Sequence, residues 1–188
     1  AARTSSPIKM IQLQIGLLAS AKELQNDLRD IAKTADTSNN SGLQRVLQET
    51  TLALLRQPGM WVYANLETGQ VPFNSAESTF NRLSLNERSK LKAELTSNVS
   101  GHQFSNEDFI SPGEADESNE YIATTIIIAT RSKLPLKEAA SSDQLQENLR
   151  ILGSISSSDL IALEIIWQPE GKGEALSSEE LVTTYPNL

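Results

Sequence analysis

The hydrophobic pattern is densest between Tyr121 and Thr130, the richest run of β-branched residues in the chain. Apolar or small side chains occupy both alternate sets of positions in this run. A strand covered on one face alternates apolar and polar residues, whereas a strand covered on both faces loses that alternation. The pattern therefore predicts an inner strand of the only sheet.

Three further segments have strand patterns. In residues 8–18 apolar residues alternate with polar or small ones, which predicts a half-buried strand. Residues 61–66 predict a short strand that ends in a turn at 68–70, because Pro72 cannot continue a central strand. The last strand is expected from Leu160 to Trp167. Its predicted inner face consists of Ile161, Leu163, Ile165 and Trp167, with Glu164 on the other face.

Apolar residues at helical spacing predict helices between these strands. The expected helices start, in order, at Ser20, about Leu43, Ser75, Ser84, Ser141 or Ser142, and Ser177. Ser84 and Glu87 fit a capping box, in which each side chain bonds the backbone N–H of the other residue, so a separate helix is expected from Ser84.

The resulting order, βααβααβαβα, predicts an α+β fold with a small mixed sheet of about four strands packed with helices. The strand–helix–strand unit 121–167 has the length of a right-handed crossover, so its two strands are expected to be parallel. A length of 188 residues suits a single domain. We expect a disordered lead-in over residues 1–6 and one soluble domain over 7–188.

The amino-acid composition excludes or disfavours several kinds of site and partner. The chain has no cysteine, which excludes disulfides, thiolate metal sites and cysteine nucleophiles. The net charge is −8 and the basic residues are scattered, which disfavours nucleic acid as a partner. No apolar run approaches the ~20 residues of a membrane-spanning helix. The chain begins at Ala1 without methionine, as expected for a fragment that lacks a targeting or membrane part.

Candidate chemistry is sparse. The single histidine, His102, would need an orienting carboxylate and a nucleophile beside it to act as a base, so a solvated loop histidine is the favoured interpretation. Glu114 and Asp116 have the alternate spacing of calcium ligands, but a solvated acidic loop over 97–119 is favoured. Phosphate-binding glycine loops and a GxSxG elbow are missing. No catalytic, cofactor or metal residue is therefore assigned.

Trp61, Tyr63 and Trp167 stand out because aromatic residues make up only 5% of the chain. Packing in the core or at its rim is the favoured interpretation. The alternative is a patch that binds a protein partner, because exposed tryptophan and tyrosine are typical interface anchors.

Several segments in order resemble the domain of unknown function 1517 family of cyanobacterial and plastid proteins. They are Ile15–Leu18, Ala35–Ser38, Leu54–Arg56, Phe80–Arg88, Asn119–Ile122, Leu152–Ile155, Ala162–Glu164 with Trp167 and Pro169, and Leu176–Ser177 with Tyr185–Pro186. The resemblance covers residues 7–188. It implies association with thylakoid or plastid envelope membranes, through segments that this chain lacks, and a link to acclimation of photosynthesis to light. The family has no agreed catalytic residues.

Three functions remain open. The first is a non-enzymatic domain for protein interaction or regulation in a membrane-associated protein. The second is a small-ligand sensor or an enzyme that uses a pocket between the helices and the sheet. The third is a domain that responds to a divalent cation through its acidic loop.

Overall fold

One antiparallel sheet organises the computed structural model, which describes residues 6–100, 120–169 and 175–188, with backbone alone for 91–100. Its strands are β1 (Ile8–Leu18), β2 (Trp61–Val71), β3 (Glu120–Thr130), β4 (Leu160–Gln168) and the short β5 (Leu176–Ser177). The strand order is β2-β1-β3-β4, and β5 pairs with β3 beyond this path. Strands β1 and β3 therefore lie inside the sheet, whereas β2 and β4 form its edges.

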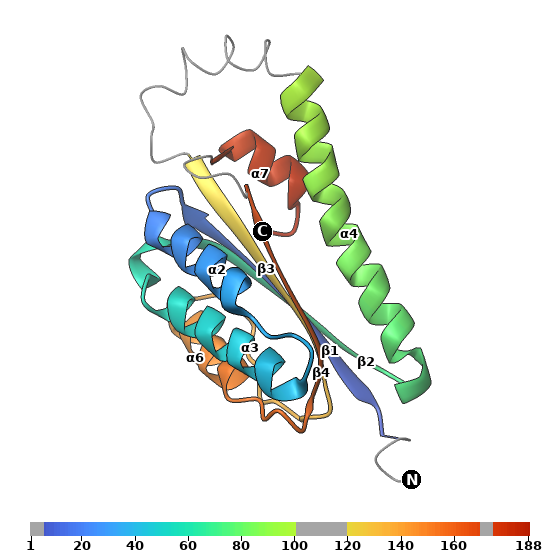
Figure 1. Cartoon of the computed structure of the whole chain (residues 1–188). Coiled ribbons are helices and arrows are strands. Elements are labelled where there is room, and N and C mark those ends of the chain that lie inside the picture. The colour runs from blue at the N-terminus through green and yellow to red at the C-terminus, as the bar shows by residue number, and fades with distance from the viewer. Residues whose placement is uncertain (1–5, 101–119, 170–174) are drawn as a thin grey trace.

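The inner position predicted for the Tyr121–Thr130 segment is confirmed. Every residue of β3 after Glu120 is buried, so both faces of this strand are covered. The covering helices lie on both sides of the sheet (Figure 1). One face carries α2 (Lys22–Thr34), α3 (Asn40–Leu55) and α6 (Ser142–Gly153), and the other carries α4 (Phe73–Ser100) and α7 (Ser178–Thr184).

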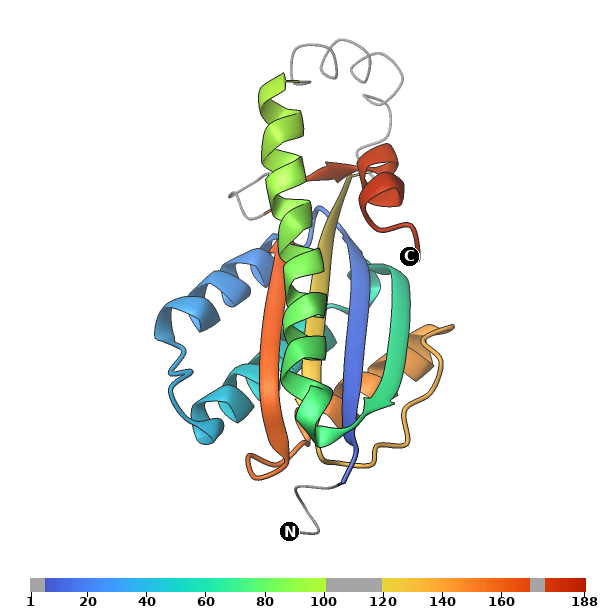
Figure 2. The same ribbon diagram turned by 90° about the vertical axis from the view of Figure 1, so that its right-hand side faces the viewer.

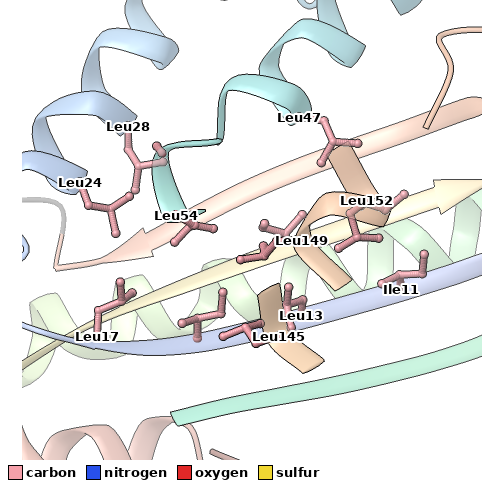
Figure 3. Packing of buried hydrophobic residues seen from close by; sticks show 14 of the residues in the cluster. Ile11, Leu13, Leu17, Leu24, Leu28, Leu47, Leu54, Leu145, Leu149 and Leu152 are labelled. Carbon is pink, nitrogen blue, oxygen red and sulfur yellow. The ribbon is translucent and has the colours of Figure 1, made fainter. Parts of the chain in front are cut away.

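The main core lies between the sheet and the layer of α2, α3 and α6. Alternate residues of β1, from Ile11 to Leu17, point into this layer (Figure 3). The leucine stripe of α6, which comprises Leu145, Leu149 and Leu152, is buried against them. Burial of each such side chain contributes roughly 1.5–3 kcal/mol, so this layer dominates the stability of the fold.

The opposite face of the sheet is covered in three zones. An apolar cluster around Ile8, Met10 and Ala129 packs on the first turns of α4, and another around Tyr121 and Leu176 packs on α7. Helix α4 runs lengthwise over this face of the sheet (Figure 2). The central zone under α4 contains polar side chains instead of a third apolar cluster.

The α+β class is confirmed, but the expectation of a mixed sheet with β3 parallel to β4 is wrong. These strands pair antiparallel, with Ile126 opposite Ile165. Residues 131–141 carry the chain away from the end of β3, and α6 brings it back to the same end (Figure 2). The Arg131 N–H then donates to the Asp159 carbonyl, which joins the end of β3 to the start of β4. The connection is long enough for a crossover between parallel strands, but here it joins two antiparallel strands at the same end of the sheet.

Local expectations differ from the structure at three further places. The segment 68–70 is not a turn, because β2 continues through it and Gly69 pairs with Met10. Helix α2 is capped at Ala21 without a side-chain bond, and Ser20 donates to the Met60 sulfur instead. A register shift between Ala129 and Thr130 turns Ile161 away from the main core, to the face covered by α4.

The two helices expected from Ser75 and Ser84 are one continuous helix, α4. Ser84 and Glu87 do not cap a new helix, because both side chains bond to the sheet. The Ser84 hydroxyl donates to Glu164 on β4, and the Glu87 carboxylate accepts bonds from β1 and β3. A sequence that fits a helix start therefore marks the buried face of a long helix.

Candidate functional site

The three aromatic residues predicted as a possible patch lie apart in the sheet. Trp61 and Tyr63 are on edge strand β2, whereas Trp167 is on the opposite edge strand, β4. Three strand spacings separate the edges, or about 14 Å. A register shift opposite Gly16 and Leu17 also turns Trp61 and Tyr63 to different faces. The structure thus does not bring the three side chains together, and their role in binding a partner stays a prediction.

Trp61 is a rim residue of the main core. It is half-buried, and its indole N–H donates to the Leu54 carbonyl at 3.1 Å. Tyr63 is more accessible, with 42% of its surface exposed, and its ring lies 5.8 Å from that of Tyr121. Burial, with the nearby Tyr63 hydroxyl, raises the pKa of the Tyr121 phenol. The Tyr121 phenol therefore remains uncharged at neutral pH, and its ring forms a pair with that of Tyr63 beside the β2 edge.

A polar cluster centred on Glu87 occupies the zone between α4 and the sheet. Glu87 is 2% exposed. Its carboxylate accepts hydrogen bonds from Gln12 at 3.2 Å, Gln14 at 3.0 Å and Thr125 at 3.0 Å, and it pairs with Lys90 at 2.7 Å. These donors come from β1, β3 and α4, so one carboxylate ties α4 to both inner strands.

The polar cluster extends to the C-terminal helix and to β4. The Lys90 ammonium lies 4.4 Å from the centre of the Tyr185 ring, and the Tyr185 hydroxyl donates to the Gln168 side-chain oxygen at 2.5 Å. On β4, Glu164 pairs with Arg88. These contacts hold α4 and the C-terminal segment on the sheet, and the side-chain nitrogen of Gln168 stays without a hydrogen-bond partner among the described residues.

A groove of about 230 Å³ opens on the other side of the sheet, between α2, α3 and β4. Apolar side chains from all three elements line it, including Leu28, Val46 and Ile165, and Trp167 is part of its wall. Of the three residues of the predicted patch, Trp167 is therefore the one that borders this groove. Its indole nitrogen is buried and has no hydrogen-bond partner in the described part of the chain.

A second hollow, of about 310 Å³, lies where α2 meets α3. Its polar wall includes Asp36, whose carboxylate accepts from the Ser38 hydroxyl at 2.5 Å and the Ser38 N–H at 3.1 Å. These bonds lower the pKa of Asp36. Asn39 caps α3 by accepting from the Gly42 N–H at 2.8 Å. These polar groups therefore form a turn and a helix cap, and they serve the turn itself.

The other residues considered for chemistry lie outside the described residues. These are His102 and the acidic residues of the loop predicted at 97–119, and the first four positions of that loop belong to α4. The cation-responsive hypothesis therefore stays a prediction. Conversely, sequence reasoning missed Glu87 and Gln14 as partners. One sequence feature could have indicated them. The face of β1 that lies under α4 carries glutamines, although a covered face normally carries apolar residues.

Comparison with known protein families identifies the family of this chain. The profile described as "Protein of unknown function (DUF1517)" matches residues 7–188. The chain belongs to this family. The resemblance inferred from the ordered segments is thereby confirmed for the whole domain. No solved structure matches the chain.

Two curated proteins share this DUF1517 domain. The chain is 41% identical over 194 residues to "Protein FLAP1 homolog A" of Synechocystis sp., covering all of this chain and 58% of that protein. It is 36% identical over 181 residues to "FLUCTUATING-LIGHT-ACCLIMATION protein 1, chloroplastic" of Arabidopsis thaliana, covering 95% of this chain and 46% of that protein. The chain thus spans about half the length of these relatives. Among its described residues, no helix is long and apolar enough to cross a membrane.

Proposed function

We propose that this DUF1517 domain binds a protein partner and acts, without catalysis, in the acclimation of photosynthesis to changing light. The names of the two relatives support the physiological setting, since one is a fluctuating-light-acclimation protein and the other is its cyanobacterial homologue. The whole protein is about twice as long in these relatives. We therefore infer that other segments tether the domain to a thylakoid or plastid envelope membrane.

The open edge of β2 is the observation that carries the binding proposal. This strand is 11 residues long, and its outer side pairs with no other strand in the described part of the chain. Edge strands are normally protected by lysine, proline or short length. Strand β2 has none of these: Glu67 is its one charged residue, and its one irregularity is the register shift between Trp61 and Tyr63. Such an edge can accept an extended peptide through backbone hydrogen bonds.

Side chains at the start of β2 would give the edge its specificity. Val62 and Tyr63 are 40% and 42% exposed, so both side chains are accessible to a partner. Tyrosine is a frequent interface anchor because its ring is apolar and its hydroxyl can bind a partner. With a net charge of −8 on the chain, a neutral or basic extended segment is the partner that fits.

We expect the paired substitution Tyr63→Lys and Thr68→Lys to abolish partner binding without unfolding the domain. Both positions are exposed on β2, and Tyr63→Lys also removes the ring contact with Tyr121, so the stability should fall by about 1–2 kcal/mol. Charges on the edge oppose strand addition, and recovery of the partner should fall about tenfold or more. The measurement is quantitative capture from solubilised photosynthetic membranes, using the full-length protein as bait.

The matched control is Leu85→Lys, which places a lysine on α4 at a side chain that is 68% exposed. This variant should recover the same partner as the unchanged protein. If the β2 variant still recovers it at an unchanged level, the edge is not the binding surface.

The physiological part of the proposal needs a separate experiment. A cyanobacterial strain that lacks the gene for its DUF1517 protein should grow normally in constant light and poorly in fluctuating light. The unchanged gene should restore growth, and the β2 variant should fail to restore it only in fluctuating light. Equal restoration by both genes would contradict a role for the β2 edge in acclimation.

A further inference from the structure

The groove between α2, α3 and β4 contains two buried polar atoms that the fold leaves without partners. They are the indole nitrogen of Trp167 and the hydroxyl oxygen of Thr50, and both residues line the groove. Neither atom has a hydrogen-bond partner among the described residues. A buried polar group in this state is costly and rare in folded proteins, so each one calls for an explanation.

Another tryptophan and a neighbouring threonine of the same layer do have hydrogen-bond partners. The indole N–H of Trp61 donates to the Leu54 carbonyl at 3.1 Å, and the Thr51 hydroxyl donates to the Gln48 carbonyl at 2.9 Å. The fold can therefore supply acceptors to such donors within this layer. Four buried side-chain atoms lack a partner among the described residues; those of Trp167 and Thr50 line the hollow between α2, α3 and β4, whereas Thr124 Oγ1 and Gln168 Nε2 do not. The position of the two atoms in the hollow indicates an acceptor that comes from outside the chain.

The rest of the groove restricts the chemistry of that acceptor. Its wall carries no lysine or arginine, so it provides nothing to neutralise an anion. The one carboxylate in the wall belongs to Glu164, which is paired with Arg88. The remaining lining is mainly aliphatic, as in Leu28 and Ile165. A neutral molecule with an apolar body therefore fits better than a charged one.

The size of the groove sets an upper limit on that molecule. A cavity of about 150 Å³ lined by apolar side chains is sufficient to bind benzene. At about 230 Å³ the groove has room for one ring with a short substituent. Because both donor atoms are buried, the ligand must displace half-buried side chains at the rim, such as Ile31 and Val46, to reach them.

We propose that this groove binds a small, neutral, largely apolar molecule whose carbonyl oxygen accepts hydrogen bonds from Trp167 Nε1 and Thr50 Oγ1. The site is separate from the β2 edge, because β4 forms the opposite edge of the sheet. A bound carbonyl oxygen can accept two hydrogen bonds through its two lone pairs, so a single group can satisfy both donors.

Acetophenone and ethylbenzene are suitable probes, because they have nearly the same size and only acetophenone has a carbonyl group. In a groove without available donors, acetophenone should bind more weakly, since its carbonyl loses hydration on burial. If the donors bind it, acetophenone should bind about fivefold more tightly than ethylbenzene.

The two tryptophans provide a direct spectroscopic readout. In a ¹H–¹⁵N correlation spectrum, saturating acetophenone should shift the Trp167 indole N–H signal downfield, as expected for a new hydrogen bond. The Trp61 signal should stay in place, because its N–H is already bonded to Leu54. The variants Trp61→Phe and Trp167→Phe assign the two signals.

Substitution of neighbouring threonines separates a binding role from a structural one. Thr50→Val keeps the side-chain shape and removes the unpartnered hydroxyl. This variant should be at least as stable as the unchanged protein. The ratio of its affinities for acetophenone and ethylbenzene should fall toward one. Thr51→Val removes a hydroxyl that is already bonded within the helix, so it should destabilise the fold and preserve the preference.

Two results would overturn the proposal. The first is binding of ethylbenzene that equals or exceeds that of acetophenone in the unchanged protein. The second is an unmoved Trp167 indole signal together with magnetisation transfer to a long-lived water. That outcome would mean that a bound water, and not a ligand, satisfies the donors.

Discussion

Replacement of Glu87 by alanine is expected to destabilise the domain by about 3–5 kcal/mol, the range measured when one partner of a buried ion pair is removed. The carboxylate accepts bonds from Gln12, Gln14 and Thr125 and pairs with Lys90. Without it, these groups remain under α4 with no acceptor. For a domain of this size the unfolding temperature should fall by roughly 10 °C or more.

The matched control is Glu147→Ala. Glu147 also pairs with a lysine, Lys137, at 2.9 Å, but both side chains are about half exposed. Loss of such a surface pair should cost at most about 1 kcal/mol. Thermal unfolding followed by circular dichroism compares the two variants under the same conditions. Similar losses for both would mean that the carboxylate of Glu87 does not hold α4 on the sheet.

The position of Glu87 also explains why the helix pattern alone was misleading. Ser84 and Glu87 have the spacing of a capping box, and local spacing cannot distinguish a helix start from two polar groups that face a sheet. The decisive information is non-local. Gln12 and Gln14 lie more than 70 positions away, and only the pairing of β1 with its neighbours brings them under α4. Periodicity therefore predicted the helical segment and missed its continuity.

Other parts of the fold were accessible from sequence because a local pattern determined them. The run from Tyr121 to Thr130 has apolar residues on both faces, and only an inner strand can bury both. The leucines of α6 recur at helical spacing, and Ser141, one of the two predicted caps, caps that helix. The direction of β4 relative to β3 could not be predicted in this way, because a connection of that length suits parallel and antiparallel strands alike.

The candidate sites were less predictable for a related reason. Trp61, Tyr63 and Trp167 could be singled out by residue type, but strand order determines which of them share a surface. The order β2-β1-β3-β4 places them on opposite edges. The lack of a partner for Thr50 has no sequence signal either, because threonine in a helix usually finds a backbone carbonyl. Only the assembled layer shows which hydroxyl lacks one.

The second large effect is expected at Gly42, in the first turn of α3. Alanine normally stabilises a helix relative to glycine, by roughly 0.5–1 kcal/mol. Here a Cβ atom would lie 1.6 Å from the backbone oxygen of Asp36, a contact that no side-chain rotation can relieve. The turn between α2 and α3 would have to move, so Gly42→Ala should destabilise the domain by about 2–3 kcal/mol.

The control for this prediction is Gly59→Ala. A Cβ atom at Gly59 would meet nothing within 4 Å, so this change should be nearly neutral. Urea unfolding of the two variants gives the sign of each effect. Displacement of the turn would also disturb the N-terminus of α3, where Asn39 accepts the Gly42 N–H, and α3 carries Thr50 into the groove. If Gly42→Ala instead stabilises the domain, helix propensity outweighs the contact, and the turn is not the rigid connection between α2 and α3 that its hydrogen bonds imply.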